Sequence, residues 1–113
     1  MLNVGCERMK DIDNSLSEVV KSRLAALRSL DLKTLRALPQ YSSEVISIED
    51  RTFSLGIYHE LLDTGDDLIV VQCYNQKSKF LWMTAGTMHA QGFVVQTDEN
   101  IRDAEEKLLW DYT

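Results

Sequence analysis

The stretch TFSLGIYHELL, residues 52–62, alternates between two sets of side chains. Successive side chains of a β-strand point to opposite faces of a sheet, so a period of two predicts a strand. One set is apolar except for a single histidine, and its members are Phe53, Leu55, Ile57, His59 and Leu61. The other set is mixed, with Tyr58 and Glu60 on either side of the histidine. This stretch therefore predicts a half-buried strand whose histidine lies on the buried face.

The sequence around this stretch predicts further strands joined by short turns. Residues 44–49 form the first strand, with Ile46 and Ile48 on one face. Residues 68–75 are apolar on both faces, which is typical of a central strand. The last strand region covers residues 80–83 and 88–95, as one broken strand or two shorter ones, and residues 84–87 between them permit a bulge or bend. The turns are expected at residues 49–51, 63–67, 75–79 and 97–100.

A helix is expected before the strands. Ser15 and Glu18 form a capping box, and the apolar residues that follow up to Leu30 recur every three or four positions. This pattern predicts an amphipathic helix over residues 15–30, with one stripe of buried side chains. Residues 1–13 carry no such pattern, and we expect them to be poorly ordered.

Two shorter helices complete the prediction. Asp31 caps a second helix that Pro39 ends. Asp103 caps a last short helix after the strands. The residues that follow return apolar surface to the body of the domain, and they are Leu108, Leu109, Trp110 and Tyr112.

These elements predict a single α+β domain that spans residues 1–113. A leading helix or helix pair packs on a four- to five-stranded antiparallel meander, and a short helix ends the chain. The element order over residues 15–97 resembles the cystatin-like and nuclear-transport-factor-like group, in which a helix lies in the concave face of a curved meander. The resemblance rests on element order and on no residue motif, so it implies a fold and no activity.

Charge is unevenly placed along the chain, whose net charge is −6. Residues 1–56 carry eight basic and eight acidic side chains, whereas residues 57–113 carry four and ten. An acidic surface disfavours nucleic acids and anionic membranes as partners, while it permits a protein partner. No apolar run reaches membrane-spanning length, and the first residues lack the pattern of a secretory signal.

The two cysteines, Cys6 and Cys73, lie far apart, without a CxxC pair or a histidine at metal-ligand spacing. Cys73 lies within an apolar run and is expected to be buried. We therefore expect free thiols, no cofactor, no metal and a cytoplasmic location.

Two histidines are the candidate catalytic residues. His59 on a buried face is either a core residue with a satisfied hydrogen bond or a pocket residue that carries protons near neutral pH. Its neighbours in sequence point the other way and form no triad with it. His89 shares its face with Gln91, Phe93 and Val95. A zinc site with both histidines, or a thiol–imidazole pair of Cys73 with His89, is chemically possible, but the spacing requires neither.

The candidate ligand-binding residues are His59, Tyr58 and Trp82. Trp82 and Phe80 share one face of a strand and follow Lys77 and Lys79, an arrangement found on surfaces that stack single-stranded nucleic acid. The acidic surroundings favour packing in a core or an interface instead.

The sequence favours a small non-enzymatic binding or protein-interaction module, because its residues with catalytic potential are few and scattered. A homodimer through the sheet is expected if the face away from the leading helix stays apolar. In a monomer, the C-terminal segment would seal that face. Two other functions remain open: a small-molecule-binding domain or small enzyme with a pocket centred on His59, and an acidic inhibitor or immunity-type protein. A pocket beside His59 would favour the former.

Overall fold

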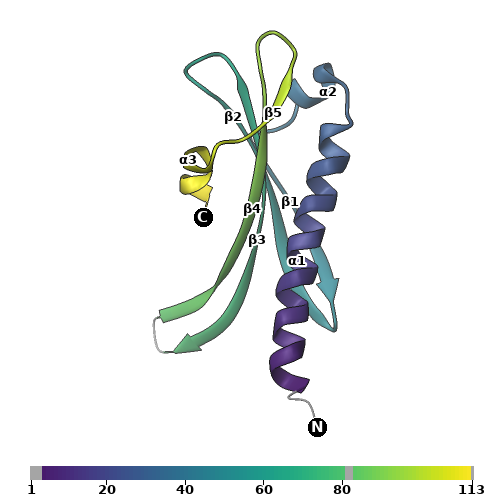
Figure 1. The fold of residues 1–113 in the computed structure, drawn as a ribbon, viewed down its shortest axis with the longest axis vertical. Helices are drawn as coiled ribbons and strands as arrows, with labels where there is room; N and C mark the ends of the chain where they lie inside the picture. Colours follow the sequence, from purple (N-terminus) through teal and green to yellow (C-terminus); the bar gives the residue numbers. More distant parts are fainter. Residues whose placement is uncertain (1–3, 81–82, 113) are drawn as a thin grey trace.

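The computed structural model describes the backbone of residues 4–80 and 83–112, and the side chains of residues 12–75, 88–110 and 112. The elements in chain order are α1 (Val4–Arg28), α2 (Leu32–Arg36), β1 (Tyr41–Ile48), β2 (Arg51–Leu61), β3 (Asp67–Phe80), β4 (Met83–Val95), β5 (Ile101–Asp103), α3 (Glu106–Leu109) and the 3₁₀ turn η1 (Trp110–Tyr112). The predicted α+β class is confirmed: a leading helix packs on an antiparallel sheet, and a short helix follows it (Figure 1).

The five strands pair in chain order as one antiparallel meander, β1-β2-β3-β4-β5. β1 and β2 join through a two-residue turn in which Glu49 and Asp50 both have positive φ. Two central residues of this conformation match the twist of a hairpin, so the predicted turn forms without a glycine. β1 lies at one edge of the sheet. At the other edge, the short strand β5 covers only residues 93–95 of β4.

α1 lies along one face of the sheet, which we call the helix face (Figure 1). Its buried residues recur every three or four positions, and they are Ile12, Leu16, Val20, Leu24 and Leu27. They pack on odd-numbered residues of the three central strands: Phe53, Leu55, Ile69, Val71, Cys73, Phe93 and Val95. The predicted amphipathic stripe is therefore confirmed, as is the burial of Cys73.

The opposite face of the sheet, which we call the outer face, is covered by the C-terminal segment. Leu68, Val70 and Val94 are buried there and pack against Leu108, Leu109 and Tyr112. Gly92 permits this close packing, since a Cβ at this position would lie 2.7 Å from the Ile69 carbonyl oxygen and 3.2 Å from Leu109. The C-terminal segment thus covers the face away from the leading helix, as the sequence predicted for a monomer.

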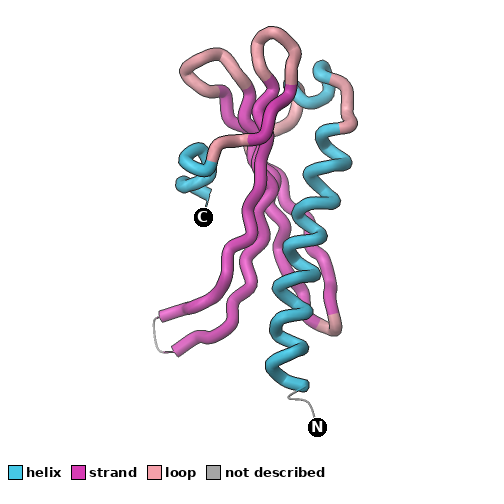
Figure 2. The backbone as a smooth tube through the Cα atoms, viewed as in Figure 1, coloured by secondary structure: helices cyan, strands magenta, loops and turns pink. Residues whose placement is uncertain are grey.

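The sheet divides partway along its length. Residues 55–61 of β2 pair with residues 67–73 of β3, and beyond this point the two strands separate. The β1–β2 hairpin and the β3–β4 hairpin then run apart (Figure 2). We call the point of separation the fork. The long β3–β4 hairpin contributes to the length of the molecule, which measures 55 × 30 × 22 Å along its principal axes.

The helix boundaries differ in part from the prediction. α1 begins at Val4, so the predicted helix start at Ser15 is wrong. Ile12 is buried and Asp13 bonds to side chains of the sheet, so packing extends the helix upstream of the capping box. The predicted cap of α2 is confirmed, because Asp31 accepts a hydrogen bond from the Thr34 N–H at 2.8 Å. In the described part of the chain, no helix has the length and apolarity to span a membrane.

The turn predicted at residues 75–79 is wrong, because β3 continues through these positions. The register of β3 with β4 shifts between Gln76 and Ser78, opposite Gly86 and Ala85, so the irregularity lies within the stretch where a bulge or bend was expected. The residues at 75–79 are polar, as suits a pair of strands that runs beyond the packed core. The same polar composition is typical of a turn, which is why the sequence predicted one there.

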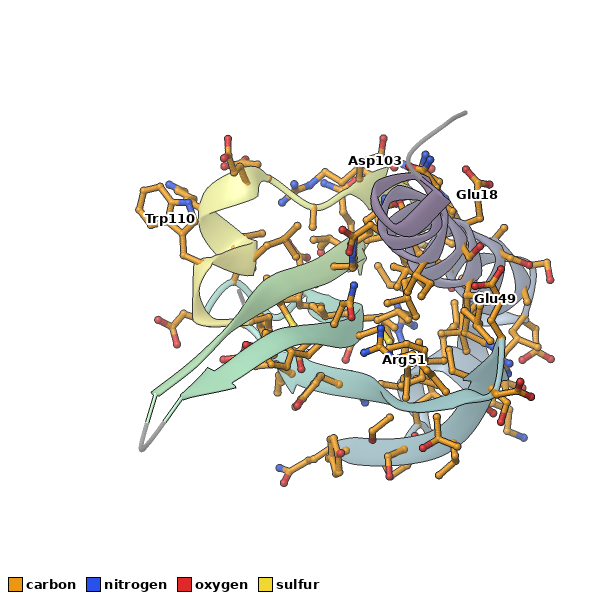
Figure 3. The ribbon with its side chains drawn as sticks, turned by 90° about the horizontal axis from the view of Figure 1, so that it is seen from below. Glu18, Glu49, Arg51, Asp103 and Trp110 are labelled. Atoms are coloured by element: carbon orange, nitrogen blue, oxygen red, sulfur yellow. The ribbon has the colours of Figure 1, made fainter. Side chains whose placement is uncertain are left out.

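The C-terminal segment also departs from the prediction. Asp103 ends β5, and Glu105 precedes the last helix, so the prediction that Asp103 caps this helix is wrong. β5 has three residues, too few to show an alternating pattern. Trp110 is 69% exposed and points away from the sheet, so the prediction that it returns to the body is also wrong (Figure 3).

Candidate functional site

His59 lies on the helix face, beside the segment that follows α2. Its Nδ1 lies 2.8 Å from the Leu38 carbonyl oxygen, and its Nε2 lies 2.8 Å from Oδ1 of Asp67. Both side chains are 12% exposed. Arg36 of α2 approaches the other oxygen of the carboxylate, with its Nε 3.6 Å from Oδ2. We call Arg36, His59 and Asp67 the His59 cluster.

Protein acceptors face both ring nitrogens of His59. A carbonyl oxygen only accepts, so Nδ1 donates to Leu38, while Nε2 faces the Asp67 carboxylate. Both ring nitrogens are therefore occupied by partners within the chain. A general base or metal ligand needs a ring nitrogen directed at its target with a free lone pair. In this arrangement His59 ties α2 to β2 and β3 and directs no such nitrogen outward.

His59 lines none of three hollows that open on the described part of the molecule. The first has a volume of about 490 Å³ and lies between α1 and β1. The second and third, of about 520 and 430 Å³, both border Arg51 near the fork. The interpretation of a pocket centred on His59 therefore gains no support from these hollows.

A second polar cluster lies at the fork. Asn75 of β3 donates to Oδ1 of Asp13 on α1 at 2.8 Å, and Nε2 of His89 on β4 lies 3.1 Å from the same oxygen. Nη2 of Arg51 donates to Oδ1 of Asn75 at 3.3 Å. The guanidinium of Arg51 also lies 5.1 Å from the centre of the Phe53 ring. We call Asp13, Arg51, Asn75 and His89 the fork cluster.

The fork cluster joins α1 to three strands at the point where the sheet divides. Asn75 is only 2% exposed, and a buried amide is stable when both its donor and its acceptor have partners. Asp13 and Arg51 supply these partners, and Arg51 lies on the helix side of the sheet (Figure 3). The contacts of His89 therefore point to a structural tie between the two hairpins and the helix.

The structure does not bring the two histidines together. His59 is aligned with Ile69 of β3, whereas His89 is aligned with Cys73, four residues further along the same strand. Four residues of strand span about 13 Å. Zinc ligands lie only about 2 Å from the metal, so the two imidazoles do not share an ion. Within the described residues, no group of three or more His, Cys, Asp and Glu side chains could hold a metal.

Cys73 lies directly opposite His89 in the β3–β4 register, but its thiol is not poised for nucleophilic attack. Cys73 is a free cysteine and is 1% exposed. Burial raises the pKa of its thiol, whereas a reactive cysteine needs a lowered pKa and access to its substrate. The thiol–imidazole pair considered from the sequence therefore lacks an accessible thiolate. The side chain of Cys6 lies outside the described residues.

Tyr58 lies on the outer face in a row of three tyrosine rings. Its ring centre is 4.9 Å from that of Tyr41 and 5.1 Å from that of Tyr112. Desolvation, with a smaller contribution from Tyr41, raises the pKa of the Tyr58 hydroxyl. The Tyr112 hydroxyl donates to Glu60 at 2.7 Å, so the row attaches the C-terminal segment to the sheet. The remaining candidate, Trp82, lies outside the described residues.

β1 presents a free edge. It pairs with β2 over its whole length, and no described strand pairs with its other side. The Gln40 carbonyl accepts from the His59 N–H at 3.0 Å, and hydrogen-bonded pairs alternate along an antiparallel ladder. The backbone groups of even-numbered β1 residues therefore point to β2. Those of the odd-numbered residues point outward, and these are Tyr41, Ser43, Val45 and Ser47.

This edge has few of the usual protections against strand pairing. Residues 41–48, YSSEVISI, contain no proline or lysine, and the register with β2 shows no bulge. Val45 is 74% exposed and Tyr41 is 52% exposed. The one charged residue, Glu44, forms an ion pair with Arg23 of α1 at 2.5 Å. The hollow of about 490 Å³ adjoins the strand and is lined by Glu18, Val19, Ser22, Arg23 and Ile46.

This edge and most of the fork cluster did not follow from the sequence. The first strand alternates like any half-buried strand, and nothing in that pattern distinguishes an edge from a centre. Asp13 fell in a segment expected to be poorly ordered, and Arg51 and Asn75 fell in predicted turns. Only His89 was singled out, because of its chemistry.

No protein-family model, curated protein or solved structure significantly matches this chain. The function is therefore inferred from the geometry of the molecule itself.

Proposed function

We propose that this protein is a non-enzymatic interaction module, which binds an extended segment of a protein as an added strand beside β1. The observation that carries the proposal is the free edge of β1, with outward backbone groups at every second residue. Main-chain hydrogen bonds supply affinity in this mode of binding, and side-chain pockets supply specificity. The domain acts as one unit in a reducing, cytoplasmic setting, where its thiols stay free.

The hollow between α1 and β1 supports the proposal. It lies next to the edge on the helix face and combines apolar Val19 and Ile46 with charged Glu18 and Arg23. Alternate side chains of an added strand point to the helix face, so they reach this hollow. The apolar residues there favour an aliphatic side chain, and the charged residues select its neighbours.

The interaction module is favoured over a small enzyme because the contacts of the two histidines are internal. His59 faces a carbonyl and a carboxylate, and His89 faces Asp13. None of the three hollows includes either histidine. No particular contact favours the acidic inhibitor, whose basis remains the charge of the second half of the chain.

The proposal is tested with extended peptides selected from a random display library on the full chain. Their affinity is compared for the wild type, Val45→Pro and Val45→Thr. Proline removes the outward N–H of residue 45 and spares the ladder to β2, whereas threonine keeps this N–H and the β-branched shape.

We expect Val45→Pro to weaken peptide binding by at least about tenfold and Val45→Thr to change it by less than about threefold. Peptides methylated at the backbone nitrogens that face β1 should bind poorly, because they cannot donate hydrogen bonds to the outward carbonyls of this strand. Selected peptides that bind Val45→Pro as tightly as the wild type would contradict the proposal.

A further inference from the structure

We infer that the segment which pairs with β1 is β1 of a second copy of this chain. The two sheets then join edge to edge across a two-fold axis, and a continuous antiparallel sheet runs through both copies. This inference rests on the proposed function and names its partner.

The pattern of exposed groups on β1 places the axis at Val45. Antiparallel pairing of two identical strands makes one residue face its own counterpart, and the bonded residues must be those with outward backbone groups. With Val45 opposite Val45, Ser43 lies opposite Ser47 of the second copy, and all of these residues are odd-numbered. This register also covers the most exposed large hydrophobic residue among those described, Val45 at 74%.

Neighbouring registers fit less well. If the pairing of the two β1 strands were shifted by one residue, the helix face of one copy would continue into the outer face of the other. A register centred on Glu44 would place two carboxylates directly opposite each other, which destabilises a strand pair. A register centred on Ile46 would pair Ser43 with Glu49, where β1 has already turned toward β2.

Charge complementarity supports the same register. Glu44 lies opposite Ile46 of the second copy when Val45 is on the axis. Arg23 and Ile46 line the same hollow, so the arginine of each copy lies near the glutamate of the other. Arg23 already pairs with Glu44 within one chain, and the interface then gathers two arginines and two glutamates around the axis.

The inference also accounts for two apolar features beside the edge, one on each face of the sheet. On the outer face, Val45 gains a direct cross-strand neighbour in its own counterpart. On the helix face, the partly buried Ile46 and the hollow beside it lie against the equivalent hollow of the second copy. Such contacts remove apolar surface from water on both faces of the joined sheet.

A cysteine cross-link tests the register. In a Cys6→Ser background, Val45→Cys should form a disulfide-linked dimer under mild oxidation, since residues in a bonded pair have Cα atoms about 5.5 Å apart. Ser47→Cys is the matched control and should remain largely uncross-linked, because its own counterpart lies about 13 Å away along the strand. A mixture of Ser43→Cys and Ser47→Cys chains should cross-link. Equal yields for Val45→Cys and Ser47→Cys would overturn the inference.

Sedimentation at micromolar concentration gives the mass of the assembly. We expect twice the chain mass of 12.9 kDa for the wild type and for Val45→Thr. Val45→Pro should raise the dissociation constant by at least about tenfold. A wild-type mass of one chain throughout this range would overturn the inference.

Charge reversal offers a second route that needs no proline in the strand. Arg23→Glu alone and Glu44→Arg alone each place like charges at the axis, so each variant should associate less than the wild type. Mixed together, the two variants bring opposite charges together across the interface and should form a heterodimer. A mixture that associates no better than its components would overturn the inference.

The inference and the proposed function fail separately. A monomeric chain whose β1 edge still binds selected peptides excludes the second copy as partner and leaves the interaction module in place. If Val45→Cys and Ser47→Cys give the same yield of disulfide-linked dimer, the chain dimerises through another interface. The register with Val45 on the axis is then wrong.

Discussion

Asp67 illustrates how single buried polar groups hold the sheet to the helices. Its carboxylate bonds to His59 and faces Arg36, so one side chain connects two strands with α2. Alternation in the sequence placed His59 on the buried face, and this position is confirmed by its contacts. The identity of its partner did not follow from the sequence, because Asp67 fell in a predicted turn and the register of β2 with β3 was unknown.

Removal of Asp67 should be costly. Asp67→Ala leaves Nε2 of His59 without its hydrogen-bond partner in a mostly buried site, a change that costs about 1–3 kcal/mol. Arg36→Ala is the control, because its ion pair at 3.6 Å is partly exposed and should contribute less than about 1 kcal/mol. The free energy of unfolding in denaturant checks both values, and a similar small loss for both variants would show that the His59 cluster is not a structural tie.

Gly92 tests the close approach between the C-terminal segment and the sheet. Gly92→Ala forces a Cβ to within 2.7 Å of the Ile69 carbonyl oxygen, and overpacking of this kind costs about 1–3 kcal/mol. Gly56→Ala is the matched control, since its Cβ would meet mainly the Tyr58 ring at 3.1 Å, which can shift. Thermal and chemical unfolding should show the larger loss for Gly92→Ala, and the reverse order would contradict this account of the outer face.

The buried thiol of Cys73 predicts a dependence of stability on pH. Burial raises its pKa above the ordinary value of 9.0, so the folded chain keeps this proton to a higher pH than the unfolded chain. The folded state then binds more protons above this pH, and stability falls as the pH rises past 9.0. Cys73→Ala should show a shallower fall over the same range. Identical slopes for the two proteins would exclude a contribution from Cys73.

At the scale of elements, α1 shows what a sequence pattern can and cannot predict. The spacing of its leucines predicted a buried stripe, because helical periodicity depends only on the local chain. The start of the helix was wrong, because contacts of Ile12 and Asp13 with the sheet decide it. The turn predicted at residues 75–79 failed for a similar reason, since strand pairing there overrides polar composition.

The stripe of α1 should dominate the stability of the two layers. Leu24 is 9% exposed on the helix face, and Leu24→Ala should cost about 2–5 kcal/mol through lost transfer energy and a cavity. Leu30→Ala provides the comparison, because Leu30 follows the helix and is 39% exposed, and should cost less than about 1 kcal/mol. Equal losses in denaturant titrations would mean that α1 does not pack as described.

The architecture of the whole molecule explains why the free edge of β1 escaped prediction. Strand order decides which strand lies at the edge, and order emerges only when all five strands are placed. The outer face, which the sequence had suggested for a dimer, is covered by Leu108, Leu109 and Tyr112. The unpaired backbone of β1 then becomes the surface best suited to a partner, although the strand itself is one of the less apolar in the sheet.

Amide hydrogen exchange along β1, measured as a function of protein concentration, tests the central claim most directly. The N–H groups of Ser42, Glu44 and Ile46 point to β2 and should be protected at every concentration. Those of Ser43, Val45 and Ser47 point outward, and their protection should rise with concentration as the edge becomes paired. Outward amides that stay unprotected at all concentrations, and also in the presence of selected peptides, would contradict the claim that β1 is the binding edge.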